Sequence, residues 1–98
     1  MHQMAEIMIR LKHFPSPPEK ETLRQIVDDK SVTENERNLA QAMINLQHQA
    51  MPADKEKLSK IINDSSTPAD IRDMAGIIFN LNHRPTSEDK EKLRQILK

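Results

Sequence analysis

The sequence predicts an all-α protein built from three tandem helical hairpins. The segment from Leu39 to Asn63 recurs at a spacing of 35 residues, as Met4 to Asp28 before it and as Met74 to Lys98 after it. Seven of the 25 aligned positions hold one residue type in all three copies. In the first copy these are Ala5, Leu11, His13, Lys20, Glu21, Leu23 and Ile26. One glycine and two aromatic residues in 98 argue against an all-β sandwich, which needs turn glycines and ring-rich strands.

The first half of each copy is predicted to be an inner helix. At 100° per residue, the apolar residues of Met4–Leu11 spread over an arc of about 200°, and Leu39–Leu46 and Met74–Leu81 repeat the pattern. A helix that is apolar over so wide an arc is contacted from more than one side. We expect the first of these helices to end near His13, because the prolines that begin at Pro15 disfavour helical backbone in the residues before them.

The second half of each copy is predicted to be an outer helix. Ser16 to Glu19 forms a capping box, and Thr86 to Asp89 offers nearly the same arrangement. The middle copy has Met51 at the cap position, and the missing side-chain cap should destabilise its helix by about 1 kcal/mol. The apolar stripe of these helices is only about 100° wide, and we assign Lys20, Glu21 and their copies to the solvated face.

Short polar joints connect the copies. Thr33 with Glu36, and Thr67 with Asp70, are predicted to cap the helices that follow the joints. Arg37 and Arg72 occupy equivalent positions, and we expect each to pair with a nearby carboxylate.

Six helices in this order form one helical-repeat domain, residues 1–98, with repeats at 1–30, 31–65 and 66–98. The predicted architecture is either a short right-handed α-solenoid or a compact six-helix bundle, since three repeats barely establish a superhelix.

Composition excludes several classes of function. The charges balance at 15 against 15, so the chain has no strong field for phosphate backbones or anionic lipid. The absence of cysteine excludes disulfides and thiolate metal sites and suits a reducing compartment. No apolar run approaches the roughly 20 residues that span a bilayer. We therefore expect a cytoplasmic protein with no membrane association and no cofactor.

One candidate binding surface is a polar strip on the inner helices, where residues recur at i, i+4 and i+7. Stacked hairpins would set these groups side by side, and repeat proteins bind ligands along such strips. The predicted strip consists of Arg10, His13, Gln41, Asn45, His48, Asn80 and His83. The alternative is a solvated face kept similar by duplication.

The three histidines also allow a structural interpretation, because an imidazolium in the last turn of a helix interacts favourably with the helix dipole. A shared metal site is not expected. Equivalent positions in stacked hairpins lie about 8–10 Å apart, whereas zinc binds its ligands at about 2 Å.

A second candidate surface lies at the N-terminal end of the stack. Met4, Ile7 and Met8 would face no upstream hairpin, and we predict there a surface for a partner or for a homodimer. The alternative is that this helix folds inward.

The resulting function prediction is a non-enzymatic protein–protein interaction module or small regulator that binds a protein or peptide. The alternative is an RNA- or DNA-binding repeat protein that uses the polar strip, although neutral charge and few rings for base stacking disfavour it. No enzyme is expected, because the chain lacks cysteine, a glycine-rich loop, GxSxG and HExxH.

Overall fold

The computed structural model describes residues 2–11, 15–46, 49–81 and 85–97, and this part of the chain forms six α-helices. They are α1 (His2–Arg10), α2 (Pro17–Asp28), α3 (Glu34–Ile44), α4 (Pro52–Ile62), α5 (Ala69–Phe79) and α6 (Ser87–Leu97). The second helices α2, α4 and α6 begin at intervals of 35 residues, at Pro17, Pro52 and Ser87. The period of the sequence is therefore the period of the structure, and the all-α class is confirmed.

The inner and outer assignments are also confirmed. The first helices α1, α3 and α5 supply most of the core, and four or five residues of each are buried. Of the outer helices, α2 and α6 each bury a single residue, Leu23 and Leu93, whereas α4 buries three, Asp54, Leu58 and Ile61. The wide and narrow apolar arcs in the sequence distinguish these two roles because burial follows the width of the arc.

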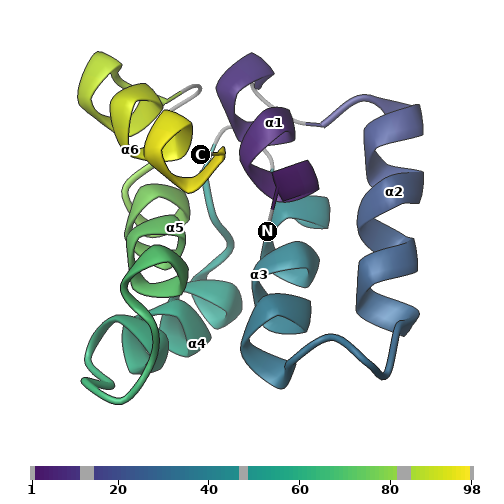
Figure 1. Ribbon diagram of the computed structural model, residues 1–98. Coiled ribbons are helices and arrows are strands. Elements are labelled where there is room, and N and C mark those ends of the chain that lie inside the picture. The colour runs from purple at the N-terminus through teal and green to yellow at the C-terminus, as the bar shows by residue number, and fades with distance from the viewer. Residues whose placement is uncertain (1, 12–14, 47–48, 82–84, 98) are drawn as a thin grey trace.

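The three hairpins close on themselves. The closest helix pairs join successive repeats, α2 with α3 and α4 with α5, and α6 packs in the same way against α1. Figure 1 shows α6 beside α1. The molecule measures 31 × 30 × 29 Å along its principal axes, so it has no long axis. Of the two predicted architectures, the compact six-helix bundle is the observed one, and the open solenoid is not formed.

This closure overturns the prediction of an exposed apolar surface at the N-terminal helix. Met4 and Met8 have 0% of their surface exposed and Ile7 has 3%. The reason is that α6 occupies the side of α1 where an open stack would have no neighbour. The three side chains belong to the core, and the expected dimer through this helix loses the exposed surface on which it was based.

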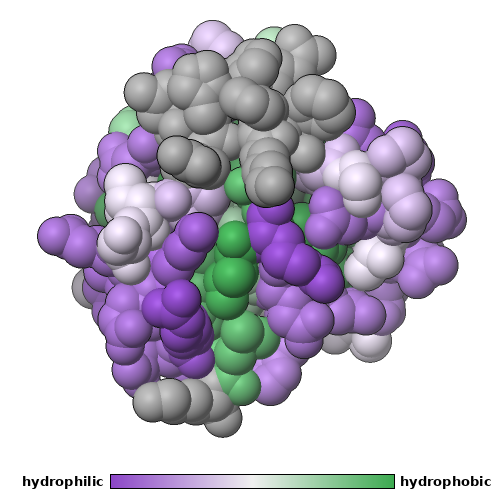
Figure 2. Space-filling model, turned by 90° about the horizontal axis from the view of Figure 1, so that it is seen from above, coloured by the Kyte–Doolittle hydropathy of each residue, from purple (hydrophilic) through white to green (hydrophobic). Residues whose placement is uncertain are grey.

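Both α1 and α6 carry apolar side chains that are only partly buried. Ile9 of α1 and Ile96 and Leu97 of α6 are partly buried and pack against the core. Figure 2 views the molecule from the side on which α6 and α1 are uppermost in Figure 1. It shows an apolar strip with hydrophilic side chains on both sides.

The predicted caps of the outer helices are present. The Ser16 backbone N–H donates to Glu19 Oε1 (2.9 Å), and the Glu19 N–H donates to Ser16 Oγ (3.4 Å). Thr86 and Asp89 exchange the same two bonds at 3.1 Å each. Met51, at the N-cap of α4, makes no side-chain cap bond.

The inner helices begin less regularly than predicted. Thr33 caps α3, because its Oγ1 accepts the Glu36 N–H at 3.2 Å. Thr67 does not cap α5: the repeat register places Pro68 at the N-cap, and Pro68 makes no side-chain cap bond. Thr67 is buried instead, and its hydroxyl accepts a hydrogen bond from Asn35 of the preceding repeat at 3.5 Å.

The same kind of turn occurs in both joints. The backbone N–H and the hydroxyl of Ser31 both donate to Asp29 Oδ1, at 2.9 and 2.6 Å, and Ser66 does the same to Asp64 at 3.0 and 2.6 Å. The serine hydroxyl and N–H hold the pKa of both carboxyl groups below the ordinary 3.8. The charges of Arg37 and Arg72 also lower these two pKa values. Arg72 Nε donates to the Thr67 carbonyl oxygen at 3.0 Å, and Arg37 Nε is buried without a hydrogen-bond partner among the described residues, so the expected pairing of each arginine with a carboxylate stays a prediction.

None of the described helices is long and apolar enough to cross a membrane.

Candidate functional site

Three residues of the predicted polar strip, Arg10, Asn45 and Asn80, lie in three separate grooves. Each groove lies between the inner and the outer helix of one hairpin, which pack less closely on each other than on neighbouring repeats. Two of the grooves also include a residue of the preceding repeat, Lys20 in the middle groove and Ile62 in the third. Arg10, Asn45 and Asn80 occupy equivalent positions at the ends of the inner helices, and each lines a hollow together with an acidic residue of its own outer helix. The closed fold therefore distributes these groups around the molecule.

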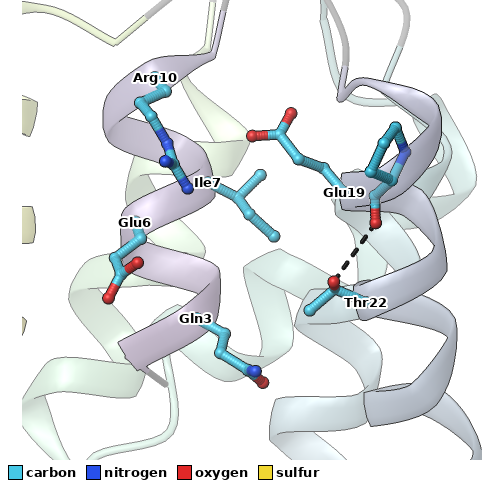
Figure 3. A pocket seen from close by; sticks show the side chains of 7 residues that line it. Gln3, Glu6, Ile7, Arg10, Glu19 and Thr22 are labelled. Carbon is cyan, nitrogen blue, oxygen red and sulfur yellow. Dashed lines mark hydrogen bonds between the residues drawn. The ribbon is translucent and has the colours of Figure 1, made fainter.

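The groove of the first hairpin has a volume of about 220 Å³ and lies between α1 and α2. Figure 3 shows Ile7 directed from α1 toward α2, with Glu19 on the opposite wall. The Thr22 hydroxyl donates to the Pro18 carbonyl at 3.3 Å, and Glu19 accepts the Ser16 N–H. Two polar groups of the α2 wall are thus already engaged within their own helix.

The groove of the third hairpin is larger, about 380 Å³, and contains Gly76 of α5. The equivalent positions in the other copies hold Glu6 and Gln41. A Cβ atom added to Gly76 would meet no heavy atom within 4 Å beyond its chain neighbours and the backbone of its own helix. Steric crowding therefore does not require a glycine at this position.

In the middle hairpin the polar groups are hydrogen-bonded to one another. Gln41 Nε2 donates to Asn45 Oδ1 at 3.4 Å, and Asn45 Nδ2 donates to Asp54 Oδ2 at 3.1 Å. Asp54 is only 7% exposed. This chain of bonds links the end of α3 to the first turn of α4 and satisfies a buried carboxylate, which would be costly to leave without a partner.

Beside this bonded chain lies an open pocket of about 390 Å³, which we call the Met51 pocket. Its lining residues are Lys20, Ile44, Asn45, Leu46, Met51, Ala53 and Asp54. Met51 is 43% exposed, and among the described residues it is the one large hydrophobic side chain that is exposed. Four of the seven lining residues are apolar, so an apolar group can enter beside Met51.

In the other repeats, larger or polar side chains stand at positions equivalent to those that line the Met51 pocket. Phe79 stands at the position of Ile44, and the Lys55 ammonium lies 5.5 Å from the centroid of its ring. Thr86 and Glu88 replace Met51 and Ala53 in the third copy, and the first copy has Ser16 at the cap. The middle repeat therefore differs from the other two in the residues at these positions. The sequence signal that could have located the pocket is methionine at a position where the other copies have a hydroxyl.

His13, His48 and His83 lie outside the described residues, and the predictions about them stay predictions. Within residues 2–11, 15–46, 49–81 and 85–97, no three histidine, aspartate or glutamate side chains are grouped to hold a metal ion.

Comparison of the chain with protein-family models, with curated proteins and with solved structures gave no match.

Proposed function

We propose that this chain is a non-enzymatic protein-binding module that receives an apolar side chain of a protein or peptide partner in the Met51 pocket. The observation that carries the proposal is a 43% exposed methionine at the rim of a hollow lined by Ile44, Leu46 and Ala53. Methionine adapts its shape to irregular contacts and is common on binding surfaces. A partner residue anchored in such a pocket typically supplies much of the energy of an interface.

The position of Met51 supports a role in binding because the residue is unfavourable for the fold. As the N-cap of α4 it leaves the helix without a side-chain cap, at a cost of about 1 kcal/mol relative to serine or threonine. It also exposes apolar surface to water. Residues that break local rules without a compensating gain in the free chain are expected at functional positions.

Nucleic-acid binding, the alternative from the sequence, has less support. Charge neutrality gives no general attraction to phosphate. The grooves that hold Arg10 and Asn80 also hold the carboxylates of Glu19 and Asp89, which repel phosphate. For the location of the protein we propose the cytoplasm, on the ground that a chain without cysteine suits a reducing compartment.

The test uses two variants of one residue. Peptides are selected from a displayed random library on the purified chain, and the enriched peptides should share one bulky apolar residue. Met51→Ser supplies the missing cap and should raise stability by about 1 kcal/mol while weakening peptide binding by about tenfold or more. Met51→Leu keeps the apolar rim and should preserve binding within about threefold.

The proposal fails if no peptide is enriched, or if the enriched peptides bind the Met51→Ser variant as tightly as the unchanged chain. Calorimetric titration gives the affinities, and thermal unfolding gives the stabilities of the same samples.

A further inference from the structure

We propose that Met51 is a reversible oxidation site, where a hydroperoxide converts the thioether to the sulfoxide while the fold remains intact. The inference rests on the contrast between this methionine and the other described ones, and on the position of Met51 at a helix end. The oxidation itself does not depend on the proposed function, whereas its consequence for binding does.

The described methionines fall into two groups by exposure. Met4, Met8, Met43 and Met74 are 0% exposed in the core, and Met51 is 43% exposed. Susceptibility of a methionine to oxidation follows its access to the oxidant. A core sulfur becomes accessible only when the protein opens locally or globally, whereas Met51 can react in the native state.

The reaction is a two-electron oxygen transfer. A lone pair of the Met51 sulfur attacks the terminal oxygen of the hydroperoxide, the O–O bond breaks, and a sulfur–oxygen bond forms. The sulfur is oxidised by two electrons, and the proton of the transferred oxygen passes to the departing hydroxide or alkoxide, which leaves as water or an alcohol. Sulfoxide reductases reverse this modification, so the site can cycle.

The backbone position explains why the fold tolerates the sulfoxide. Met51 has φ −70° and ψ 149°, close to the −67° and 163° of Ser16, which caps the equivalent helix α2. The first N–H groups of a helix have no partner within the helix, and a side-chain oxygen acceptor is favourable beside them. A sulfoxide oxygen at Met51 is such an acceptor, whereas the same oxygen on a core methionine would be buried among apolar side chains.

Oxidation also changes the pocket. Met51 forms its rim together with Ile44 and Ala53. A polar, chiral sulfoxide in place of the thioether removes apolar surface from this rim. The consequence for the proposed function is a weaker hold on an apolar partner side chain after oxidation.

The test is a time course with hydrogen peroxide, followed by peptide mass mapping of each methionine. The Met51 peptide should gain one oxygen about tenfold faster or more than peptides with Met4, Met8, Met43 or Met74. Circular dichroism of the singly oxidised protein should retain the helical signal, and a methionine sulfoxide reductase should restore the original mass. Oxidation of a core methionine at the rate of Met51, or loss of helix after oxidation at Met51 alone, would overturn the proposal.

Met51→Leu serves as the matched control, because it retains an apolar side chain at the rim and has no sulfur. Peroxide should leave its peptide affinity unchanged and should weaken that of the unchanged chain by about tenfold. Selective oxidation of Met51 without any change in peptide affinity would support the oxidation site and contradict the proposed binding pocket. If Met51 is not oxidised selectively while Met51→Ser still weakens peptide binding, the result contradicts the oxidation site and supports the proposed binding pocket.

Discussion

The Lys55 ammonium lies 5.5 Å from the centroid of the Phe79 ring and joins the second repeat to the third. Lys55 is in the first turn of α4, and Phe79 is the last residue of α5. The same lysine recurs as Lys20 and Lys90, and all three are half-buried, while the glutamates that follow them are exposed. The prediction of a solvated face is therefore right for the glutamates and wrong for the lysines, whose stems lie against the structure.

The Lys55–Phe79 contact gives the first prediction. Lys55→Ala should lower the free energy of unfolding by about 0.5–1 kcal/mol, the range of a cation–π contact at an exposed site. In a chain that already carries Phe79→Ile, which reproduces Ile44, the same change should cost less. Urea denaturation of the four proteins of this double-mutant cycle measures the difference. Lys57→Ala, an exposed position of the same helix, should change stability by less than about 0.5 kcal/mol, and equal effects at Lys55 and Lys57 would contradict the assignment.

A second prediction concerns the core. Leu46 follows α3 and is 1% exposed, and its equivalents Leu11 and Leu81 are also buried. Leu46→Ala should destabilise the fold by about 2–5 kcal/mol, because it removes buried methyl groups and leaves a cavity. Thermal and chemical unfolding measure the loss. Gln25→Ala on the exposed face of α2 is the control and should stay within about 0.5 kcal/mol. Similar losses for both variants would show that the inner residues do not form the core.

Local pattern predicts the helices and their burial but not the closure of the fold. The arc of apolar residues along Met4–Leu11 shows that this helix needs neighbours on several sides, and it does not say which helix supplies them. Closure depends on the small rotation between successive hairpins, which side-chain packing between α2 and α3 and between α4 and α5 determines. For this reason Met4, Ile7 and Met8 could be predicted as apolar and helical, and the packing of α6 against their helix could not.

The Met51 pocket, like the closure of the fold, could be predicted from the sequence only in part. The sequence identifies Met51 as a missing cap, because that inference needs only the residue and its position in the repeat. The pocket additionally requires that Ile44 and Ala53 lie around Met51 and that Lys20 reaches it from α2. Contacts between helices that are distant along the chain carry no periodic signal.

Gly76 gives a third prediction. Glycine in the interior of a helix costs about 0.5–1 kcal/mol relative to alanine, and an added Cβ at this position meets no heavy atom within 4 Å beyond its chain neighbours and the backbone of its own helix. Gly76→Ala should therefore stabilise the protein by about that amount and raise Tm by roughly 4–8 °C per kcal/mol. Differential scanning calorimetry provides the measurement. Gly76→Gln, which reproduces Gln41, should also be stabilising, and a loss of stability in either variant would show that the position is sterically constrained.

The joints give a prediction on pH. The folded-state pKa values of Asp29 and Asp64 are lowered, so their contribution to stability is present above about pH 4 and is lost as pH falls through the folded values. NMR titration of the carboxyl carbons should give midpoints below 3.8 for both groups. Ser66→Ala should raise the pKa of Asp64, because it removes the hydroxyl that donates at 2.6 Å. Ser65→Ala, one residue away in the same joint, is the matched control and should leave the midpoint unchanged.

The packing of α6 against α1 predicts that the chain tolerates circular permutation. By the 35-residue register, the joint from Asp64 to Asp70 corresponds to a seven-residue link from Lys98 to Met1. A chain with a copy of that joint as the link, and with new ends between Lys30 and Ser31, should fold with unchanged helical content and stability within about 2 kcal/mol. Circular dichroism and urea denaturation measure both properties.

The same experiment distinguishes the closed bundle from an open stack. Seven extended residues reach at most about 25 Å. This length is ample to connect two helices in contact, but it is barely enough to connect the two ends of an open stack of three hairpins. If the seven-residue permutant is unfolded or aggregated while the unpermuted chain with new tails of equal length is folded, α1 and α6 do not pack together in solution.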